Sequence, residues 1–363
     1  MNLLLDNIVF NQQKAGGISL LWSEIIKYIL EHNIKCLFVE YEGNQVNVYR
    51  QTLDLNNLIL KKFKYNKILS LLPRINNNYL NARYVCLSSD YNITISKKVQ
   101  NVVVVHDIIN ELYEKRVFIR WFKKYYKKRA VSYADAVICV CENTRKDLMT
   151  LYPDIEKNKV YVVHNCVSDD YKVLDKVKTD NTLFQNTPYV IFIGRRKGYK
   201  NFNTVVDALQ IYKNINFVII GSGKLSLKET INLNKKIGEK RYIHYIGIDN
   251  KKLNILYNNA YSLIYPSEYE GFGIPIIEAQ SAGCPVITSN KSSLPEVGGS
   301  GCIYIDNITP ESIYSALKKL EDIYFRDQLI EAGLINSKKF TPEKTANEYI
   351  NICRLVWNNQ YNS

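Results

Sequence analysis

Residues 260–285 read AYSLIYPSEYEGFGIPIIEAQSAGCP, and this stretch says most about how the chain folds. Its first part, Ala260–Tyr265, is an apolar run that predicts a buried strand. A glycine-rich turn follows, and Pro275 then marks the start of a helix, because proline is favoured at the first helical position, where its missing N–H costs nothing. The stretch therefore predicts a strand, a turn rich in free backbone amides, and a helix.

The same alternation of short β-branched runs and helical stretches extends over most of the 363 residues. Near-continuous apolar strands separated by helices are typical of a parallel sheet covered on both faces. The predicted strands are Asn2–Leu5, Lys35–Glu40, Tyr84–Leu87, Asn101–Val105, Ala136–Val140, Val160–Val163, Tyr189–Ile193, Asn216–Ile220, Tyr242–Ile246, Ala260–Tyr265, Pro285–Thr288 and Ile303–Ile305. The predicted helices include Ser19–Glu31, Val117–Tyr133, Asn203–Tyr212, Lys251–Asn259, Pro275–Ala282 and Pro342–Trp357.

A polar stretch at Ser168–Pro188 interrupts this series and is typical of a linker. The length alone predicts two or three domains at roughly 100–200 residues each. We therefore expect an α/β protein with two Rossmann-like, doubly wound domains, residues 1–170 and 186–340, facing a central cleft. Residues 341–363 are predicted to form a helix that crosses back to the N-terminal domain. In such sheets, ligands bind at the carboxyl ends of the strands.

The chain is basic, because 48 Lys and Arg residues against 35 Asp and Glu residues give a net charge of +13. An excess of this kind suggests a polyanionic partner such as nucleic acid, an anionic membrane or phosphorylated ligands. Hydrophobic residues make up 46% and charged residues 23% of the chain. These values exclude a disordered chain and a small disulfide-stapled module.

No targeting or membrane-spanning segment is expected. Residues 1–10 lack a basic region ahead of an apolar core, so we predict no secretory signal. No apolar run approaches the ~20 residues that a membrane-spanning helix needs. The eight cysteines form no CxxC pair and have no histidine partners at zinc spacing. Reduced, buried thiols in a cytoplasmic protein are therefore expected.

Two carboxylates flank the glycine-rich turn. The turn Gly271–Ile274 presents backbone N–H groups beside a helix N-terminus, which is a ready site for an anion. Glu270 precedes the turn and Glu278 lies in the first turns of the helix, so both can face the same ligand. Taken singly, Glu278 is equally explained as a glutamate favoured by the helix dipole, and Glu270 as a solvated loop residue. Their combination is more specific than either alone.

This segment resembles the Glu-x7-Glu motif of the retaining, GT-B-fold glycosyltransferases of family 4. Seven residues separate Glu270 from Glu278 and include Gly-Phe-Gly-Ile-Pro. The resemblance implies that Glu270 contacts the transferred sugar and that Glu278 holds the ribose hydroxyls of a nucleotide-diphosphate sugar. It also implies donor contacts from the turn, at Gly271, Phe272, Gly273 and Ile274. The resemblance covers nearly the whole chain and is strongest from Tyr189 to Val297.

Residues 194–202, GRRKGYKNF, follow a predicted strand and resemble the family's Gly-Arg…Lys element. Cleavage of a sugar nucleotide leaves negative charge on the departing diphosphate, and fixed cations stabilise that charge as it develops. The resemblance puts Gly194, Arg195 and Lys200 at the diphosphate. Arg196 and Lys197 are weaker candidates, because a basic loop is usually only solvated.

Other strand ends carry further candidates. Gly16 and Gly17 resemble the family's N-terminal glycine loop, where the backbone approaches the donor phosphates and the acceptor closely. His106 follows the strand Asn101–Val105. A lone histidine is more often structural, but the family has a histidine at this strand end that contacts the transferred sugar. Asp107 would orient it or face the acceptor, and Gly221 resembles the turn near the nucleotide.

Residues 113–130 contain eight Lys or Arg residues interleaved with aromatic residues, as on an amphipathic helix. Phe118, Phe122, Tyr125 and Tyr126 fall on or near one side, with most cations elsewhere. One interpretation is a helix whose aromatic side packs on its sheet. The other is a contact with an anionic membrane surface through Lys115–Arg129, joined by a second basic patch at Lys61–Lys67.

The sequence thus predicts a retaining glycosyltransferase without a cofactor or catalytic metal, since it contains no Asp-x-Asp triplet. The donor would be a GDP- or UDP-sugar, with a hexose or deoxyhexose such as mannose. The acceptor would be a glycan hydroxyl, lipid-linked, in the synthesis of a surface polysaccharide at the inner face of the membrane. Three alternatives remain: another GT-B enzyme such as an epimerase or phosphorylase, a Rossmann dehydrogenase, and a basic nucleic-acid-binding protein. The dehydrogenase lacks a G-x-G-x-x-G after the first strand, and the paired Glu and Arg/Lys sets argue against nucleic acid.

Overall fold

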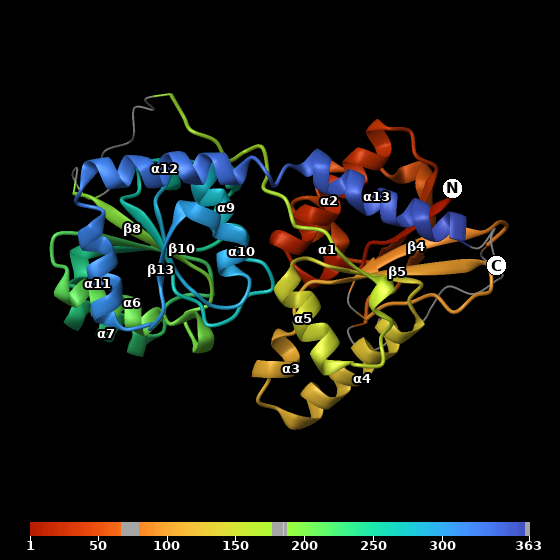
Figure 1. Cartoon of the computed structure of the whole chain (residues 1–363), viewed down its shortest axis with the longest axis horizontal. Helices are drawn as coiled ribbons and strands as arrows, with labels where there is room; N and C mark the ends of the chain where they lie inside the picture. Colours follow the sequence, from red (N-terminus) through yellow and green to blue (C-terminus); the bar gives the residue numbers. More distant parts are fainter. Residues whose placement is uncertain (67–79, 90, 176–183, 185–186, 360–363) are drawn as a thin grey trace. The chain divides into compact units, whose positions relative to one another are not determined.

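The computed structural model describes residues 1–66, 80–89, 91–175, 184 and 187–359. The chain divides into two compact units. Unit 1 comprises Met1–Cys166 and Pro342–Ser363, and unit 2 comprises Val167–Thr341. Each unit is built on one sheet whose described strands all run parallel (Figure 1). Both units are therefore α/β, as the alternating pattern predicted.

The sheet of unit 1 has the strand order β3-β2-β1-β4-β5-β6-β7. Chain order reverses direction at β1, so the loops after β1 and β4 diverge there, which is where doubly wound sheets bind ligands. The strands are β1 Leu3–Asp6, β2 Cys36–Tyr41, β3 Ile59–Phe63, β4 Tyr84–Ser89, β5 Val99–Val105, β6 Ala136–Cys139 and β7 Val160–Val162. The helices are α1 Val9–Gln12, α2 Gly17–Glu31, α3 Ile109–Tyr113, α4 Val117–Tyr133, α5 Glu142–Leu151 and α13 Pro342–Asn359.

Helix α13 joins unit 1 although it is the last helix of the chain. It lies beside α2 in Figure 1, and the hydroxyl of Tyr28 in α2 donates a hydrogen bond to Oδ1 of Asn347 at 3.0 Å. The guanidinium of Arg83 donates to the carbonyl of Trp357 at 2.7 Å and lies over the indole ring. The side chain of Gln100 donates to the carbonyl of Val356 at 2.8 Å. These contacts satisfy carbonyls in the last turns of the helix, which have no partner within the helix itself.

The sheet of unit 2 has the order β10-β9-β8-β11-β12-β13, with the reversal at β8. The strands are β8 Tyr189–Ile193, β9 Asn216–Ile220, β10 Tyr242–Tyr245, β11 Ser262–Tyr265, β12 Val286–Ser289 and β13 Cys302–Ile305. The helices are α6 Phe202–Ile211, α7 Leu227–Lys236, α8 Asn250–Asn259, α9 Ile274–Ser281, α10 Leu294–Gly298, α11 Pro310–Lys319 and α12 Ile323–Ser337. Strands β8 and β11 are neighbours, with Ile191 opposite Leu263. The loops that follow these two strands therefore lie next to each other.

The structure adds one strand that the sequence did not predict. Strand β3 pairs with β2 at the edge of the sheet and carries Lys61 and Lys62 in its middle, both exposed. Lysines are common on edge strands because their charge discourages pairing with another chain. The predicted basic patch Lys61–Lys67 is thus part strand and part loop, and Lys67 lies outside the described residues.

All eight cysteines are buried and free, as expected from their spacing. None of the helices in the described ranges combines the length and the apolar composition that crossing a bilayer would need.

Candidate active site

The glycine-rich turn of unit 2 lies between the end of β11 and the start of α9. Gly273 precedes the helix with φ 105°, and a Cβ there would lie 3.0 Å from Cδ2 of Leu294, so a larger residue is disfavoured on both counts. The hydroxyl of Ser293 donates to the carbonyls of Glu270 at 3.1 Å and Phe272 at 2.8 Å. Ser293, at the start of α10, thus holds the backbone of the turn by hydrogen bonds. The backbone geometry of the turn is therefore set before any ligand binds.

Lys200 and Glu270 form a buried ion pair at the carboxyl ends of β8 and β11. The ammonium group of Lys200 also donates to the hydroxyl of Tyr265 at 2.8 Å. Burial first, and then the neighbouring Glu270, raise the pKa of Tyr265 well above its usual value, so the phenol stays protonated. An ammonium group has three N–H donors, and these two partners use two of them. Within the part of the chain that the structure describes, one N–H of Lys200 is left for a ligand oxygen.

Glu278 lies on α9, behind the turn, with 9% of its surface exposed. The hydroxyl of Tyr257 donates to its Oε2 at 3.3 Å. Burial raises the pKa of Glu278 to about 7, and its tyrosine partners only partly offset that effect. A carboxylate is thus held where its ionisation is costly, which is typical of functional sites more than of surface helices.

The loop after β8 brings further predicted residues to the same edge of the sheet. Gly194 packs against Lys200, because a Cβ on Gly194 would lie 3.6 Å from Cε of that lysine. Gly221, at the end of β9, approaches Gly194 so closely that its Cβ would lie 3.6 Å from the Gly194 nitrogen. Arg195 is exposed. The structure therefore gathers Gly194, Lys200, Gly221 and Glu270, and leaves Arg195 pointing to solvent.

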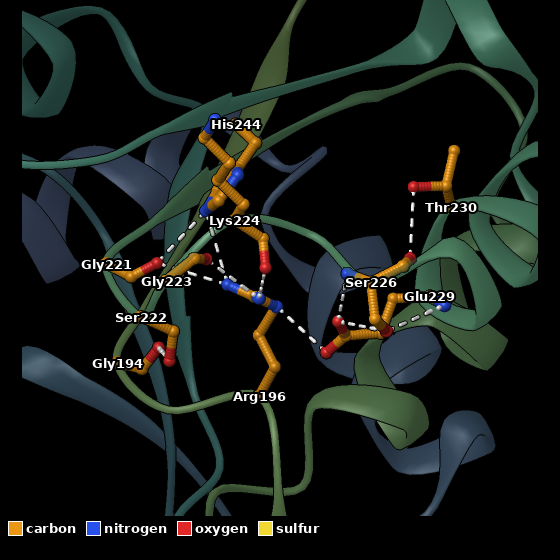
Figure 2. A network of polar contacts seen from close by, with 10 residues as sticks. All are labelled: Gly194, Arg196, Gly221, Ser222, Gly223, Lys224, Ser226, Glu229, Thr230 and His244. Atoms are coloured by element: carbon orange, nitrogen blue, oxygen red, sulfur yellow. Dashed lines mark hydrogen bonds and ion pairs between the residues drawn. The ribbon is translucent and has the colours of Figure 1, made fainter.

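Arg196 is not a solvated loop residue, so that part of the sequence interpretation is wrong. It is 8% exposed, and its guanidinium donates to the carbonyls of Gly221, Gly223 and Lys224 at 3.0–3.2 Å. Its Nε pairs with Oε1 of Glu229 at 3.0 Å, and Oε2 of that glutamate accepts from the amide of Ser226. Figure 2 shows this single guanidinium between the loop after β9 and the start of α7. Arg196 thus sets the shape of the Gly221–Lys224 turn.

A cavity of about 660 Å³ lies over this network. Its lining includes the loop after β8, with Arg195 and Lys197, and the loop after β9, with Ser222 and Lys224. Four basic residues and one carboxylate, Glu229, line this hollow, and the net positive charge favours an anionic ligand. Sequence reasoning named Arg196 only as a weaker diphosphate candidate and missed Tyr265, because a single arginine in a basic run, or a tyrosine at a strand end, carries no pattern of its own.

The predicted residues of unit 1 lie at the carboxyl edge of its own sheet. His106 follows β5 and is buried, with Nε2 at 3.0 Å from the hydroxyl of Ser89 at the end of β4. Its Nδ1 is buried and has no hydrogen-bond partner among the described residues. Burial, and secondarily the charge of Lys127, lower the pKa of His106 to about 4, against an opposing effect of Asp107. The imidazole is therefore neutral at pH 7.

Asp107 caps the next turn, because its Oδ1 accepts from the amide of Ile109 at 2.9 Å. It therefore supports the loop after His106. Gly16 precedes α2 and its carbonyl accepts from the amide of Leu20 at 2.9 Å. A Cβ on Gly16 would lie 2.6 Å from Oε1 of Gln13, so the loop has no room for a side chain unless Gln13 moves.

The basic aromatic segment forms α4 over the predicted range, but its aromatic side does not pack on the sheet. Phe118 is 75% and Trp121 60% exposed, and Trp121 stacks on the exposed Tyr125. The buried residues of α4 are Lys127, Ala130 and Val131, and Lys127 is 1% exposed and pairs with Glu111. Lys127 is therefore removed from the predicted membrane-facing cations.

Comparison with known proteins agrees with the fold of the two units. Two Rossmann-like units with helices on both faces of parallel sheets define the GT-B class. The model of the family described as Glycosyl transferases group 1 matches residues 175–334, and that of Glycosyltransferase Family 4 matches residues 62–171. Together they cover well over half of the chain. The chain belongs to the GT-B glycosyltransferases of family 4, with a group 1 domain in unit 2.

Two relatives show how much sequence this chain shares with named mannosyltransferases. The O-antigen chain mannosyltransferase B of Escherichia coli is 28% identical over 236 residues, which are 61% of this chain and 61% of that protein. The match thus spans less than two thirds of that relative. The O-antigen chain mannosyltransferase RfbU of Salmonella typhimurium is 26% identical over 285 residues, covering 77% of this chain and 75% of the relative.

Solved structures share the fold. A glycosyltransferase from Rickettsia africae superposes with a TM-score of 0.74 at 16% identity, covering 99% of both chains. HepE of Anabaena, in complex with UDP and glucose, gives a TM-score of 0.71 at 13% identity, covering 97% of this chain and 98% of that one.

Proposed function

We propose that this protein is a retaining, metal-independent glycosyltransferase that moves a sugar from a nucleotide-diphosphate donor to a hydroxyl of a glycan acceptor. The observation that carries the proposal is the buried Lys200–Glu270 pair beside the anion-binding turn of α9. Carboxyl ends of strands in doubly wound sheets are where such folds bind nucleotides.

Each residue of unit 2 then has a role. The remaining N–H of Lys200 binds a diphosphate oxygen, and Arg195 reaches the same group from the exposed side of the loop. Negative charge grows on the diphosphate as the sugar departs, so cations fixed there stabilise the transition state more than the ground state. Glu270 orients the transferred sugar, and Glu278 accepts hydrogen bonds from the ribose hydroxyls.

Retention needs a path for the acceptor proton without an enzymatic nucleophile. Glu270 is tied to Lys200, so it is poorly placed to attack the sugar itself. We assign a front-face attack, in which the acceptor hydroxyl approaches from the side of the departing diphosphate and gives its proton to a diphosphate oxygen. The neutral imidazole of His106, with its free Nδ1, serves the transferred sugar as a hydrogen-bond partner.

The relatives suggest which sugar is moved. Two of them carry the name O-antigen chain mannosyltransferase, and HepE binds UDP and glucose. We therefore propose mannose as the first candidate, from a GDP- or UDP-linked donor, and an O-antigen-type glycan on a lipid carrier as the acceptor.

Nucleotide binding is the first test. Thermal unfolding would be followed with GDP, UDP, ADP and dTDP at 1 mM, each with EDTA and again with Mg²⁺. A ligand present at 100 times its Kd stabilises by about 2.7 kcal/mol. We expect one nucleoside diphosphate to raise the Tm by several degrees with EDTA present. No shift with any of them contradicts the donor site, and a shift only with Mg²⁺ contradicts metal independence. Product analysis then separates transfer from epimerisation.

The exposed face of α4 supports a place at the membrane. Its exposed Phe118, Trp121 and Tyr125 occur together with the exposed Arg120 and Lys124, and Lys115 just precedes the helix. These three cations have no carboxylate partner among the described residues. Aromatic and basic side chains together favour an interface rich in anionic headgroups, at about 1 kcal/mol for each basic residue near the surface. We propose that this face binds the anionic leaflet that holds the lipid-linked acceptor.

Co-sedimentation with phosphatidylglycerol vesicles tests the membrane face. The variant with Lys115, Arg120 and Lys124 changed to glutamine is expected to lose most of the binding. A control with Lys213, Lys240 and Lys251 of unit 2 changed to glutamine loses the same net charge. Equal binding by the two variants contradicts a specific face and indicates a nonspecific charge effect.

A further inference from the structure

The buried lysine of α4 has no part in the membrane face or in the donor site, and its surroundings suggest another use. Lys127 and Glu111 are each 1% exposed in their side chains, and Nζ lies 3.1 Å from Oε1 of the glutamate. Removing a charged pair from water costs several kcal/mol per ion, so a buried pair is poor evidence for stability alone. A function that needs a fixed geometry is the better explanation.

The ammonium group also binds the backbone next to the histidine. Lys127 donates to the carbonyl of Asp107 at 2.6 Å, and Asp107 directly follows His106. The same ammonium lies 5.3 Å from the ring centre of Tyr91. Tyr91 in turn donates its amide to the carbonyl of Ser89, whose hydroxyl contacts His106. The lysine therefore touches both segments that enclose the imidazole.

A second lysine of α4 is connected to the same tyrosine. Lys123, one turn earlier on α4, donates to Oδ1 of Asn110 at 2.7 Å, and Nδ2 of that asparagine contacts the hydroxyl of Tyr91 at 3.3 Å. Two lysines of α4, one turn apart, thus contact α3 and the loop after β4. Displacing α4 would disturb both supports of His106 together.

We propose that Lys127 is a positioning residue for His106, acting through the carbonyl of Asp107 and the ring of Tyr91. The inference rests on the proposed function for one point, the contact of His106 with the transferred sugar. It goes further by assigning a residue that contacts neither donor nor acceptor to the arrangement of the imidazole.

The charge of Lys127 has a second, measurable effect. Three influences set the pKa of His106: burial lowers it most, Asp107 raises it, and Lys127 lowers it. Among the described residues, the ring's other polar contact is the hydroxyl of Ser89, which carries no charge. Loss of the ammonium charge therefore raises the pKa of His106, and it does so whether or not the protein transfers sugar.

The test uses the full chain and four variants. Lys127→Met alone leaves a buried carboxylate without its cation, so the double variant Lys127→Met/Glu111→Gln is the main one. Lys127→Arg keeps the charge, and Lys146→Met removes the same charge from an exposed position on α5, outside the membrane segment. Circular dichroism confirms that each variant is folded. The His106 resonance is the one that disappears in His106→Gln.

For the double variant we expect the pKa of His106, followed by NMR from pH 7 to pH 4, to rise. We expect kcat to fall by about 100-fold with the donor KM within twofold, because a small misplacement of a reacting group costs about that much. Lys127→Arg recovers most of both, and Lys146→Met matches the wild type. Titration and turnover of the double variant like those of Lys146→Met overturn the inference. A shifted titration in a protein that transfers no sugar refutes the proposed function and leaves the positioning contact standing.

Discussion

Replacing Glu278 by glutamine is expected to stabilise unit 2 above pH 7 while it weakens nucleotide binding. The carboxyl is buried on α9, and that burial raises its pKa from 4.5 to about 7. Glutamine has nearly the same shape and can keep the hydrogen bond from the hydroxyl of Tyr257. It carries no charge at any pH. The substitution therefore removes a cost that the wild type bears only when Glu278 is ionised.

The sign and size of this effect follow from the two pKa values. Between pH 4.5 and pH 7 the native carboxyl holds more protons than the unfolded one, so native stability falls as the pH rises through that interval. At about 1.4 kcal/mol per unit, a rise from 4.5 to about 7 amounts to a loss of about 3 kcal/mol above pH 7. Glu278→Gln escapes this loss. Its advantage over the wild type should be near zero at pH 4.5 and about 3 kcal/mol at pH 8.

The assay is urea denaturation of wild type and variant at pH 5, 6, 7 and 8, with tyrosine fluorescence and far-UV circular dichroism as probes, because all three tryptophans belong to unit 1. At each pH the free energy of unfolding of the wild type is subtracted from that of the variant. The change of this difference with pH is the informative quantity, because a packing effect that is the same at every pH does not alter it. Calorimetry with the nucleoside diphosphate that binds the wild type should show a weaker Kd for the variant by one to two orders of magnitude, as expected for losing one charged hydrogen-bonding group.

Glu331→Gln is the matched control, since it changes an exposed glutamate of α12 in the same way. Its stability difference should stay flat with pH. A difference for Glu278→Gln that is equally flat, or that favours the wild type at pH 8, would refute the reasoning about burial. A stabilised variant that binds the nucleotide as tightly as the wild type would remove Glu278 from the donor site.

Two other changes probe the supports of the site. Arg196→Met leaves several carbonyls and Glu229 without their donor, so urea denaturation should show a loss of roughly 2–3 kcal/mol, and calorimetry a weaker nucleotide Kd. Lys235→Met, at an exposed position near the end of α7, should change neither; equal effects of the two would show that only net charge matters. His106→Gln addresses unit 1. The pKa of His106 is lowered to about 4, so native stability falls as the pH drops from 6.5 towards 4, and this variant should unfold at lower pH than the wild type. An unchanged acid midpoint would contradict the burial of a neutral imidazole.

The parallel sheets were predictable because their strands are buried on both faces and read as apolar runs. Strand β3 was not, since an edge strand with two lysines at its centre resembles a solvated basic loop. The order of the strands within each sheet could not be predicted from the sequence either. The contact between Ser89 and His106 exists because β4 and β5 are neighbours in the sheet, and no local pattern states that.

Two basic residues show where prediction of side-chain positions from the sequence fails. Arg196 and Lys127 both lie in runs of basic residues, and sequence alone treats all members of such a run alike. The structure separates them, because each is buried by acceptors that come from distant segments. For α4 the helical period was correct, yet Phe118 and Tyr125 are exposed, Phe122 and Tyr126 are half-buried, and a lysine faces inward. A buried lysine is tolerated only with a partner, and its partner Glu111 lies on another helix.

The central claim is that the Lys200–Glu270 pair carries out glycosyl transfer. The most direct measurement is the rate at which nucleoside diphosphate is released from GDP-mannose and from UDP-sugars, with acceptor lipid extract, for wild type, Lys200→Ala and Glu270→Ala. Glu268→Ala, an exposed glutamate two positions away, is the control. The account predicts wild-type and control turnover with at least one donor. For the two site variants it predicts losses of about 100- to 1,000-fold with the fold intact. Turnover of either site variant within a few-fold of the wild type would contradict it.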